Sequence, residues 1–107
     1  MAIHPTAIID KTAEISPEVE IGPYCYIGPQ VVIGQGCWLG PQVVILEMTK
    51  IGKNCSIYSG AIIGGKPQDY KFKDRPSFVE IGDDNIIREY VTIHRSSEEE
   101  GKTVIGN

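Results

Sequence analysis

The residues best suited to chemistry lie in one polar stretch, GGKPQDYKFKDRP, at residues 64–76. It places two carboxylates among four of the ten Lys and Arg side chains: Lys66, Asp69, Lys71, Lys73, Asp74 and Arg75. Clustered cationic groups suit a phosphate or diphosphate, and loops on a rigid scaffold commonly carry binding groups. Mixed charge is also typical of a solvated surface loop. Residue chemistry therefore leaves two interpretations open, a surface loop or a site for an anionic ligand.

These groups must be positioned by the rest of the chain, whose dominant feature is a six-residue period. Six residues of α-helix, at roughly 100° each, would spread the repeated side chain around the cylinder. In extended chain the same residues all point to one side. The period therefore predicts strands of a solenoid. The repeated residues are Ile3, Ile9, Ile15, Ile21, Ile27, Ile33, Leu39, Ile45, Ile51, Ile57, Ile63, Ile81, Ile87, Ile93 and Ile105.

Each six-residue unit reads as one short strand and one corner. A small or slim residue stands two positions before the repeated isoleucine, where it would share the interior. Glycine usually follows the isoleucine and proline often comes next, and we interpret both as bend residues that supply an unusual or a fixed φ. Three units would close a triangular coil, and stacked coils form a parallel β-helix. We predict a single all-β domain at residues 1–107 with about six coils.

The repeat lapses twice, and we expect loop excursions near residues 65–78 and 95–102. The first lapse is polar and contains two prolines, so it cannot line a core. Whether it replaces part of a coil or is inserted stays open, because Ile81 follows Ile63 by three repeat units in both cases. The second lapse contains the run SSEEEG, which is typical of solvated surface.

The three cysteines all occupy the small interior position of the repeat. Cys37 follows Cys25 by two repeat units, and Cys55 follows Cys37 by three. We expect all three to be buried and reduced, with Cys37 and Cys55 stacked one coil apart. Parallel side-chain directions and a reducing compartment argue against a disulfide between them.

Composition excludes some partners. The net charge of −4 and a pI of about 5.1 argue against a general nucleic-acid binder. No apolar run approaches the roughly 18 residues of a membrane span, and the N-terminus lacks a signal-peptide pattern. We therefore expect no membrane span and a cytoplasmic location. Outward positions show no decisive apolar stripe, so the repeat by itself does not predict self-association.

The aliphatic, glycine and small-residue pattern resembles the hexapeptide-repeat proteins, and this resemblance covers nearly the whole chain. It implies a left-handed coil, a hand that the spacing cannot supply. More specifically, IGGKPQDYKF and RPSFVEIGDDNIIREYVTIHRS resemble the corresponding region of the bacterial UDP-N-acetylglucosamine acyltransferases of lipid A biosynthesis. The N-terminal segments IHPTAIID and IGPYCYIGP fit the same family.

That resemblance implies transfer of an (R)-3-hydroxyacyl group from acyl carrier protein to the sugar 3-hydroxyl of UDP-N-acetylglucosamine. Residues matching Gln68, Asp69 and Lys71 contact the nucleotide sugar or the acylated product in that family, and His94 matches a histidine near the cleft. Family members are homotrimers whose clefts lie between neighbouring prisms. The resemblance implies no cofactor and no metal.

The chain departs from the family pattern at the catalytic base. The family's catalytic histidine falls in the coil after residue 107, and neither His4 nor His94 matches it. We therefore interpret the chain as the N-terminal portion of such an enzyme, without the family's later coils and C-terminal helical domain. No catalytic residue is assigned, and we predict that these 107 residues alone do not acylate.

Three alternatives compete with this interpretation. The chain could be a noncatalytic β-helical scaffold or oligomerisation fragment. It could also belong to another group of hexapeptide sugar N- or O-acyltransferases, although the Gln68-Asp69-x-Lys71 segment favours the O-acyltransferases. A β-helical carbonic anhydrase requires several histidines converging on zinc, and two histidines at opposite ends of the chain, His4 and His94, do not provide them.

Overall fold

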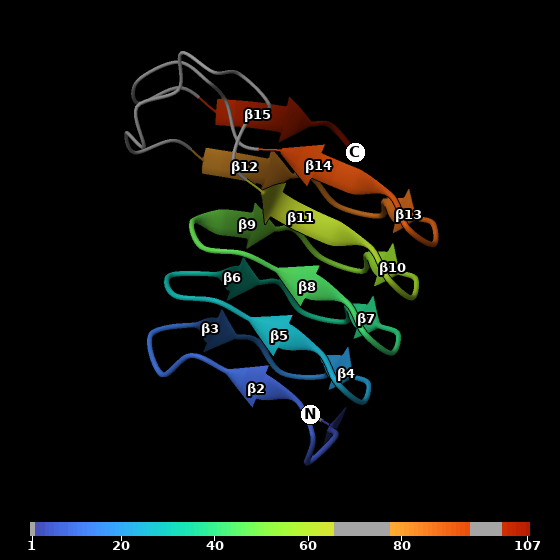
Figure 1. Ribbon diagram of the computed structural model, residues 1–107. Coiled ribbons are helices and arrows are strands. Elements are labelled where there is room, and N and C mark those ends of the chain that lie inside the picture. The colour runs from blue at the N-terminus through green and yellow to red at the C-terminus, as the bar shows by residue number, and fades with distance from the viewer. Residues whose placement is uncertain (1, 66–77, 95–101) are drawn as a thin grey trace.

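The computed structural model describes residues 2–65, 78–94 and 102–107, and in these ranges the chain forms three parallel sheets of five short strands each (Figure 1). Sheet A contains β1 (Ala2–Ile3), β4 (Glu20–Ile21), β7 (Trp38–Leu39), β10 (Ser56–Ile57) and β13 (Ile86–Ile87). Sheet B contains β2 (Ile8–Ile9), β5 (Tyr26–Ile27), β8 (Val44–Ile45), β11 (Ile62–Gly65) and β14 (Thr92–His94). Sheet C contains β3 (Glu14–Ile15), β6 (Val32–Ile33), β9 (Thr49–Ile51), β12 (Phe78–Ile81) and β15 (Lys102–Ile105).

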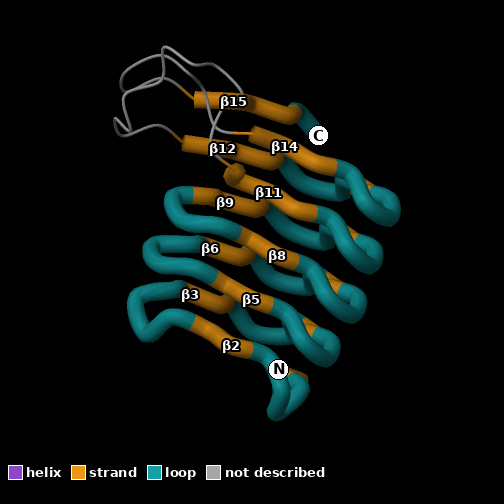
Figure 2. Tube along the Cα trace, viewed as in Figure 1, coloured by secondary structure: helices purple, strands orange, loops and turns teal. Residues whose placement is uncertain are grey.

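The chain visits sheets A, B and C in turn, so three consecutive strands make one coil, and the predicted parallel β-helix is confirmed (Figure 2). The described residues form five such coils, close to the number expected from the length of the chain. No helix that could cross a membrane is found in the described ranges.

Strand register settles how the first excursion joins the coil. Ile33 pairs with Ile51, three repeat units further along the chain, whereas Ile51 pairs with Ile81, five units further along. The first excursion is therefore an insertion of two units between β11 and β12, and it replaces no side of a coil. Ile81 pairs with Ile105, four units further along, so the second excursion adds one unit between β14 and β15. Together the two insertions take up the length of one coil.

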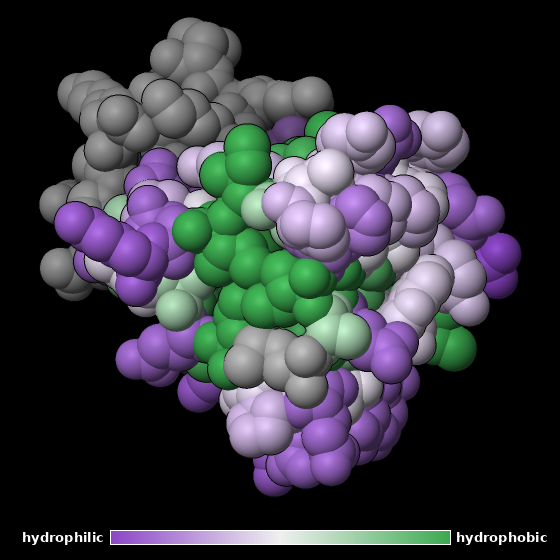
Figure 3. Space-filling view, turned by 90° about the horizontal axis from the view of Figure 1, so that it is seen from below, coloured by the Kyte–Doolittle hydropathy of each residue, from purple (hydrophilic) through white to green (hydrophobic). Residues whose placement is uncertain are grey.

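The predicted interior is confirmed. The repeated isoleucines and the small residues two positions before them fill the prism. Between Val19 and Ile63, every apolar residue in these two sets is at most 3% exposed. In each strand every second side chain points to the same side. A six-residue repeat therefore directs the same two positions of every unit into the core. At the N-terminal end of the stack this core is less covered, since Ile9 and Ile15 are only half-buried. Figure 3 shows that end, with apolar side chains gathered at its centre.

The glycines that directly follow the repeated isoleucines differ from expectation. Left-handed φ occurs three positions after the repeated residue, often at a non-glycine such as Tyr24 (φ 59°) or Gln30 (φ 58°). The glycine directly after the isoleucine has no left-handed φ at most corners, Gly64 being the exception at +88°. Its role is close packing, because a Cβ on Gly34 would lie 2.7 Å from the backbone of Gly52 in the next coil.

The cysteine predictions are confirmed. Cys25, Cys37 and Cys55 are free and buried, and the pairing of Trp38 with Ser56 puts Cys37 and Cys55 in the same column of sheet A. Each thiol donates to a backbone carbonyl of the next coil, for example Cys37 Sγ to the Gly52 oxygen at 3.0 Å. Burial raises the pKa of the Cys37 thiol to about 11, which makes it a poor nucleophile.

Candidate functional site

Both insertions start at the same corner of the prism, between sheets B and C, in adjacent coils. β11 ends at Gly65 and β14 ends at His94, and these two residues are Cα partners across the ladder. The ladder shifts register between Ile63 and Gly65, an irregularity of the kind that a β-bulge produces, and bulges commonly redirect a strand. This corner is the candidate site, because the segment with the clustered charges is inserted here.

His94 is the predicted site residue that the structure describes. It lies half-buried at the end of β14, next to the corner where the first insertion starts. Its backbone carbonyl accepts a hydrogen bond from the Thr103 hydroxyl at 2.8 Å, which ties β14 to β15 across the second insertion. The backbone that carries the ring is thus fixed beside the entry of the first insertion. Gln68, Asp69 and Lys71 lie outside the described residues.

Beneath the same corner lies a buried hydroxyl that the sequence did not single out. Thr49 is 1% exposed, and its Oγ1 has no hydrogen-bond partner. A Cβ added to Gly64 would lie 2.5 Å from this oxygen. The sequence signal for it is slight, since a threonine in the small interior position reads as an ordinary core residue.

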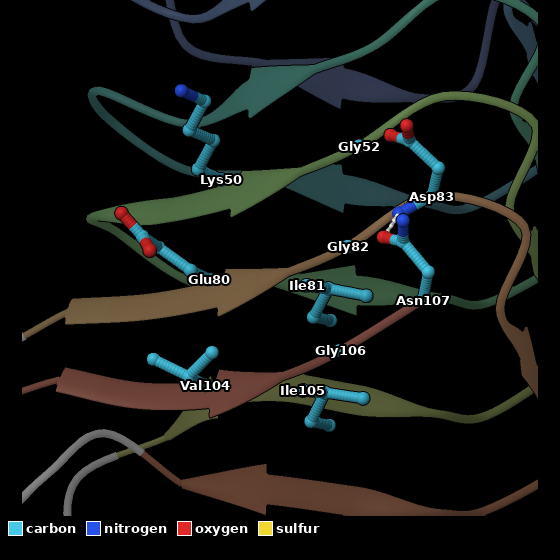
Figure 4. A pocket seen from close by; sticks show the side chains of 10 residues that line it. All are labelled: Lys50, Gly52, Glu80, Ile81, Gly82, Asp83, Val104, Ile105, Gly106 and Asn107. Atoms are coloured by element: carbon cyan, nitrogen blue, oxygen red, sulfur yellow. Dashed lines mark hydrogen bonds between the residues drawn. The ribbon is translucent and has the colours of Figure 1, made fainter.

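A groove of about 370 Å³ runs along the edge between sheets C and A (Figure 4). Three corner glycines line it, together with Lys50, Glu80 and Val104 from sheet C. At the corner, Asp83 Oδ1 accepts from the Lys53 amide at 2.7 Å, and the Asp83 amide donates to Asn107 Oδ1 at 2.6 Å. The polar groups at this corner therefore join successive coils, so we assign the groove no chemical role.

An aromatic and cationic cluster covers the edge between sheets A and B. The rings of Trp38 and Tyr58 meet edge to face at 5.3 Å between centroids, and the Arg88 guanidinium lies 4.7 Å from the centroid of Tyr58. Arg88 Nε also contacts Glu89 Oε1 at 2.9 Å, which lowers the pKa of that carboxyl. Tyr58 and Arg88 stand where a corner glycine is usual, so the cluster could have been read from the sequence, but it was missed.

The other reactive groups of the described residues do not gather into a metal centre. His4 Nδ1 lies 2.8 Å from Thr6 Oγ1 in the first coil, far from the candidate corner. Within the described ranges no three His, Cys, Asp or Glu side chains gather as metal ligands. The candidate corner thus offers a histidine ring and the root of a charged segment, which suit binding and orientation of a polar ligand.

Comparison with known proteins agrees with this architecture. The family model described as the GMPPB C-terminal domain matches residues 2–72. An acyl-[acyl-carrier-protein]–UDP-N-acetylglucosamine O-acyltransferase of Thermodesulfovibrio yellowstonii is 55% identical over 98% of this chain and 41% of its own length. The corresponding protein of Chlorobaculum parvum is 53% identical over 99% of this chain and 40% of its own length.

Solved structures show the same similarity. The UDP-N-acetylglucosamine acyltransferase of Bacteroides fragilis superposes with a TM-score of 0.95 and 46% identity, over 98% of this chain and 41% of its own. LpxA of Acinetobacter baumannii superposes with a TM-score of 0.94 and 44% identity, over 100% of this chain and 42% of its own. The coil is left-handed, as the resemblance to the hexapeptide-repeat proteins implied.

The chain spans about two fifths of the length of these relatives. It belongs to the GMPPB C-terminal domain family, and along its whole length it is homologous to part of the hexapeptide-repeat UDP-N-acetylglucosamine O-acyltransferases.

Proposed function

We propose that this chain is part of an acyltransferase that moves an (R)-3-hydroxyacyl group from acyl carrier protein to the 3-hydroxyl of UDP-N-acetylglucosamine, the first step of lipid A biosynthesis in the cytoplasm. The observation that carries the proposal is the 55% identity to such an O-acyltransferase over 98% of the chain. The placement of His94 at the root of the charged insertion supports it.

In this reaction the sugar hydroxyl oxygen attacks the thioester carbonyl carbon while a base removes the hydroxyl proton. The C–S bond then breaks, and the thiolate of the carrier protein takes up a proton. A hydroxyl is too weak an acid to attack without such a base, and we assign that base to no residue of this chain. We assign this chain the binding of the nucleotide sugar.

Four residues carry the proposed binding. Asp69 orients the sugar through its hydroxyls, and Lys71 places positive charge beside the polar end of the substrate. Gln68 contributes amide hydrogen bonds, and it follows Gly65 by three residues, which span at most about 11 Å of extended chain. His94, whose Cα pairs with Gly65, is therefore within reach of a ligand held by this segment.

Calorimetric titration of the 107-residue chain with UDP-N-acetylglucosamine tests this assignment. Asp69→Asn and Lys71→Met should each weaken binding about tenfold, since each removes a charge-assisted contact. Lys73→Met is the matched control, because it removes an equal charge from the same insertion without removing a proposed contact. Equal affinity for UDP-glucose, or equal losses for Lys71→Met and Lys73→Met, would favour the scaffold alternative.

The assignment also predicts that the chain does not catalyse transfer by itself. Incubation with UDP-N-acetylglucosamine and a 3-hydroxyacyl carrier protein should yield no O-acyl product by mass spectrometry. Product formation by the purified 107-residue chain would contradict this prediction.

We further propose that the chain assembles as a homotrimer through the outer face of sheet B. Outward side chains there include Ile8 (65% exposed), Tyr26, Val44 and Ile62, with no charge among them. The outer faces of sheets A and C each carry charged residues. We expected no decisive apolar stripe at the outward positions. On sheet B, outward apolar side chains recur once per coil, and they line up only when each coil has been divided among the three sheets.

Light scattering after gel filtration tests the assembly. Ile62→Lys should shift the chain toward monomer, because a buried unpaired charge is strongly unfavourable. Ser56→Lys is the matched control, since it adds the same charge to the outer face of sheet A in the same coil. A trimer that is unaffected by Ile62→Lys would place the interface elsewhere.

A further inference from the structure

Thr49 has a buried hydroxyl that packing does not explain. Its Oγ1 is the one buried side-chain oxygen or nitrogen in the described part of the chain that lacks a hydrogen-bond partner. Nearly all buried hydroxyls are bonded in native structures. Valine has almost the same shape and occupies the same position of the repeat at residues 31, 43 and 79. An apolar residue would therefore fill this place at no cost in polar desolvation.

Three cysteines show what a polar atom at this position normally does. Cys25 Sγ donates to the Gly40 oxygen at 3.1 Å and Cys37 Sγ to the Gly52 oxygen at 3.0 Å, each fifteen residues on. Cys55 Sγ donates to the Gly82 oxygen at 3.2 Å, and its spacing is twelve residues longer because the first insertion intervenes. The acceptor is thus the corner glycine that precedes the same sheet in the next coil.

By this rule the acceptor for Thr49 is Gly64, fifteen residues on. Gly64 departs from the acceptor glycines, because its φ is +88° and the ladder shifts register just after Ile63. The space that its Cβ would fill lies against the Thr49 oxygen and the Leu46 and Glu47 carbonyls. The peptide at Gly64 is therefore rotated relative to the other corners, and Thr49 makes no hydrogen bond to its carbonyl.

We propose that the Gly64 peptide is a two-position switch whose second position is stabilised by a hydrogen bond from the Thr49 hydroxyl to the Gly64 carbonyl. The second position restores the arrangement seen at the three cysteines. This inference rests on the proposed function, because Gly64 lies four residues before Gln68, and we assign the second position to the nucleotide-sugar complex. A ligand can shift such an equilibrium only as far as its affinities for the two positions differ.

Two substitutions of Thr49 separate the effect of its hydroxyl from the effect of its side-chain shape. Thr49→Val keeps the shape and removes the hydroxyl, and it should weaken UDP-N-acetylglucosamine binding about fivefold, the equivalent of one net hydrogen bond. Thr49→Ser keeps the hydroxyl and should bind within about twofold of the parent chain. Equal affinities for the parent chain and Thr49→Val, or equal losses for both variants, would overturn the coupling to the ligand.

Thermal unfolding without ligand supplies a matched control. Thr103→Val makes the same replacement at the same repeat position in sheet C, but it removes a hydroxyl that donates to the His94 carbonyl at 2.8 Å. It should lower the Tm, whereas Thr49→Val should leave the Tm unchanged or raise it. A Tm lowered equally by both would show that Thr49 already has a partner in the ligand-free chain, which contradicts the proposal.

Relaxation-dispersion NMR tests the switch without reference to the ligand. The Gly64 and Gly65 amides of the parent chain and of Thr49→Ser should show microsecond to millisecond exchange, and Thr49→Val should reduce it. If the parent chain does not bind UDP-N-acetylglucosamine but shows this exchange, the proposed function fails and the switch stands. If the amides show no exchange with or without ligand, the switch itself is refuted.

Discussion

Replacement of Gly34 by alanine tests why glycine recurs at the corners. A Cβ there would lie 2.7 Å from the carbonyl carbon and oxygen of Gly52 and 3.0 Å from the Lys53 nitrogen. All three atoms are backbone, so no flexible side chain can yield, and two coils must separate by several tenths of an ångström. Gly34 does not have a left-handed φ, so any effect measures packing between coils.

The expected magnitude follows from two opposing effects. Overpacking of this kind destabilises by roughly 1–3 kcal/mol, and the backbone contacts place Gly34→Ala toward the upper end. Alanine also restricts the unfolded chain, which stabilises by about 0.4–1 kcal/mol. The net loss is about 2 kcal/mol, and a domain of this size should then unfold about 10 °C lower. Circular dichroism during heating, with urea unfolding as a second measurement, gives both values.

Gly106→Ala is the matched control for this substitution. Gly106 occupies the same corner column and also lacks a left-handed φ, but no described heavy atom lies within 4 Å of its added Cβ. The same replacement should therefore leave the Tm unchanged or raise it by a few degrees, about 2–4 °C. If both variants lower the Tm equally, glycine is required at these corners for its conformation, and the packing explanation is refuted.

Other predictions concern ionisable groups. Because burial raises the folded-state pKa of Cys37 from 9.0 to about 11, this thiol contributes stability below pH 9 that is lost as the pH rises toward 11. Urea midpoints across this range should fall less for Cys37→Ala than for the parent chain, and equal slopes would contradict the assignment. Arg88→Ala removes an exposed ion pair and a cation–π contact, and exposed pairs of this kind contribute little, so we expect its urea midpoint to stay close to that of the parent chain. A midpoint lowered as far as that of Gly34→Ala would assign the cluster a larger structural role.

Much of the prism could be predicted from the sequence, because the information is local. Alternation along a strand assigns each isoleucine and each small residue to the interior without knowledge of its neighbours in space. The same phase placed the three cysteines in the core, where the structure finds them free and buried. The corner glycines were located correctly but explained wrongly, since only the stacked coils reveal how close Gly34 comes to Gly52.

The candidate site could be located only in part. The charged segment stood out because Asp69 and Arg75 interrupt the repeat, and family resemblance supplied Gln68, Lys71 and His94. The ligand contacts assigned to Gln68, Asp69, Lys71 and His94 remain predictions. The pairing of His94 with Gly65 could not be predicted, because it depends on the length of chain inserted between β11 and β12.

The period, the interior and the places where the repeat fails could all be read from the order of residues along the chain. The three-dimensional fold is needed to see that the first excursion is inserted within a coil, between β11 and β12, that both insertions start at one corner, and that Ile8, Tyr26, Val44 and Ile62 share a face. The closeness of Thr49 Oγ1 to Gly64 likewise follows from the stacking of the coils. This difference arises because alternation acts between residues two apart, whereas register joins residues a whole coil or more apart and is set by backbone hydrogen bonds between coils.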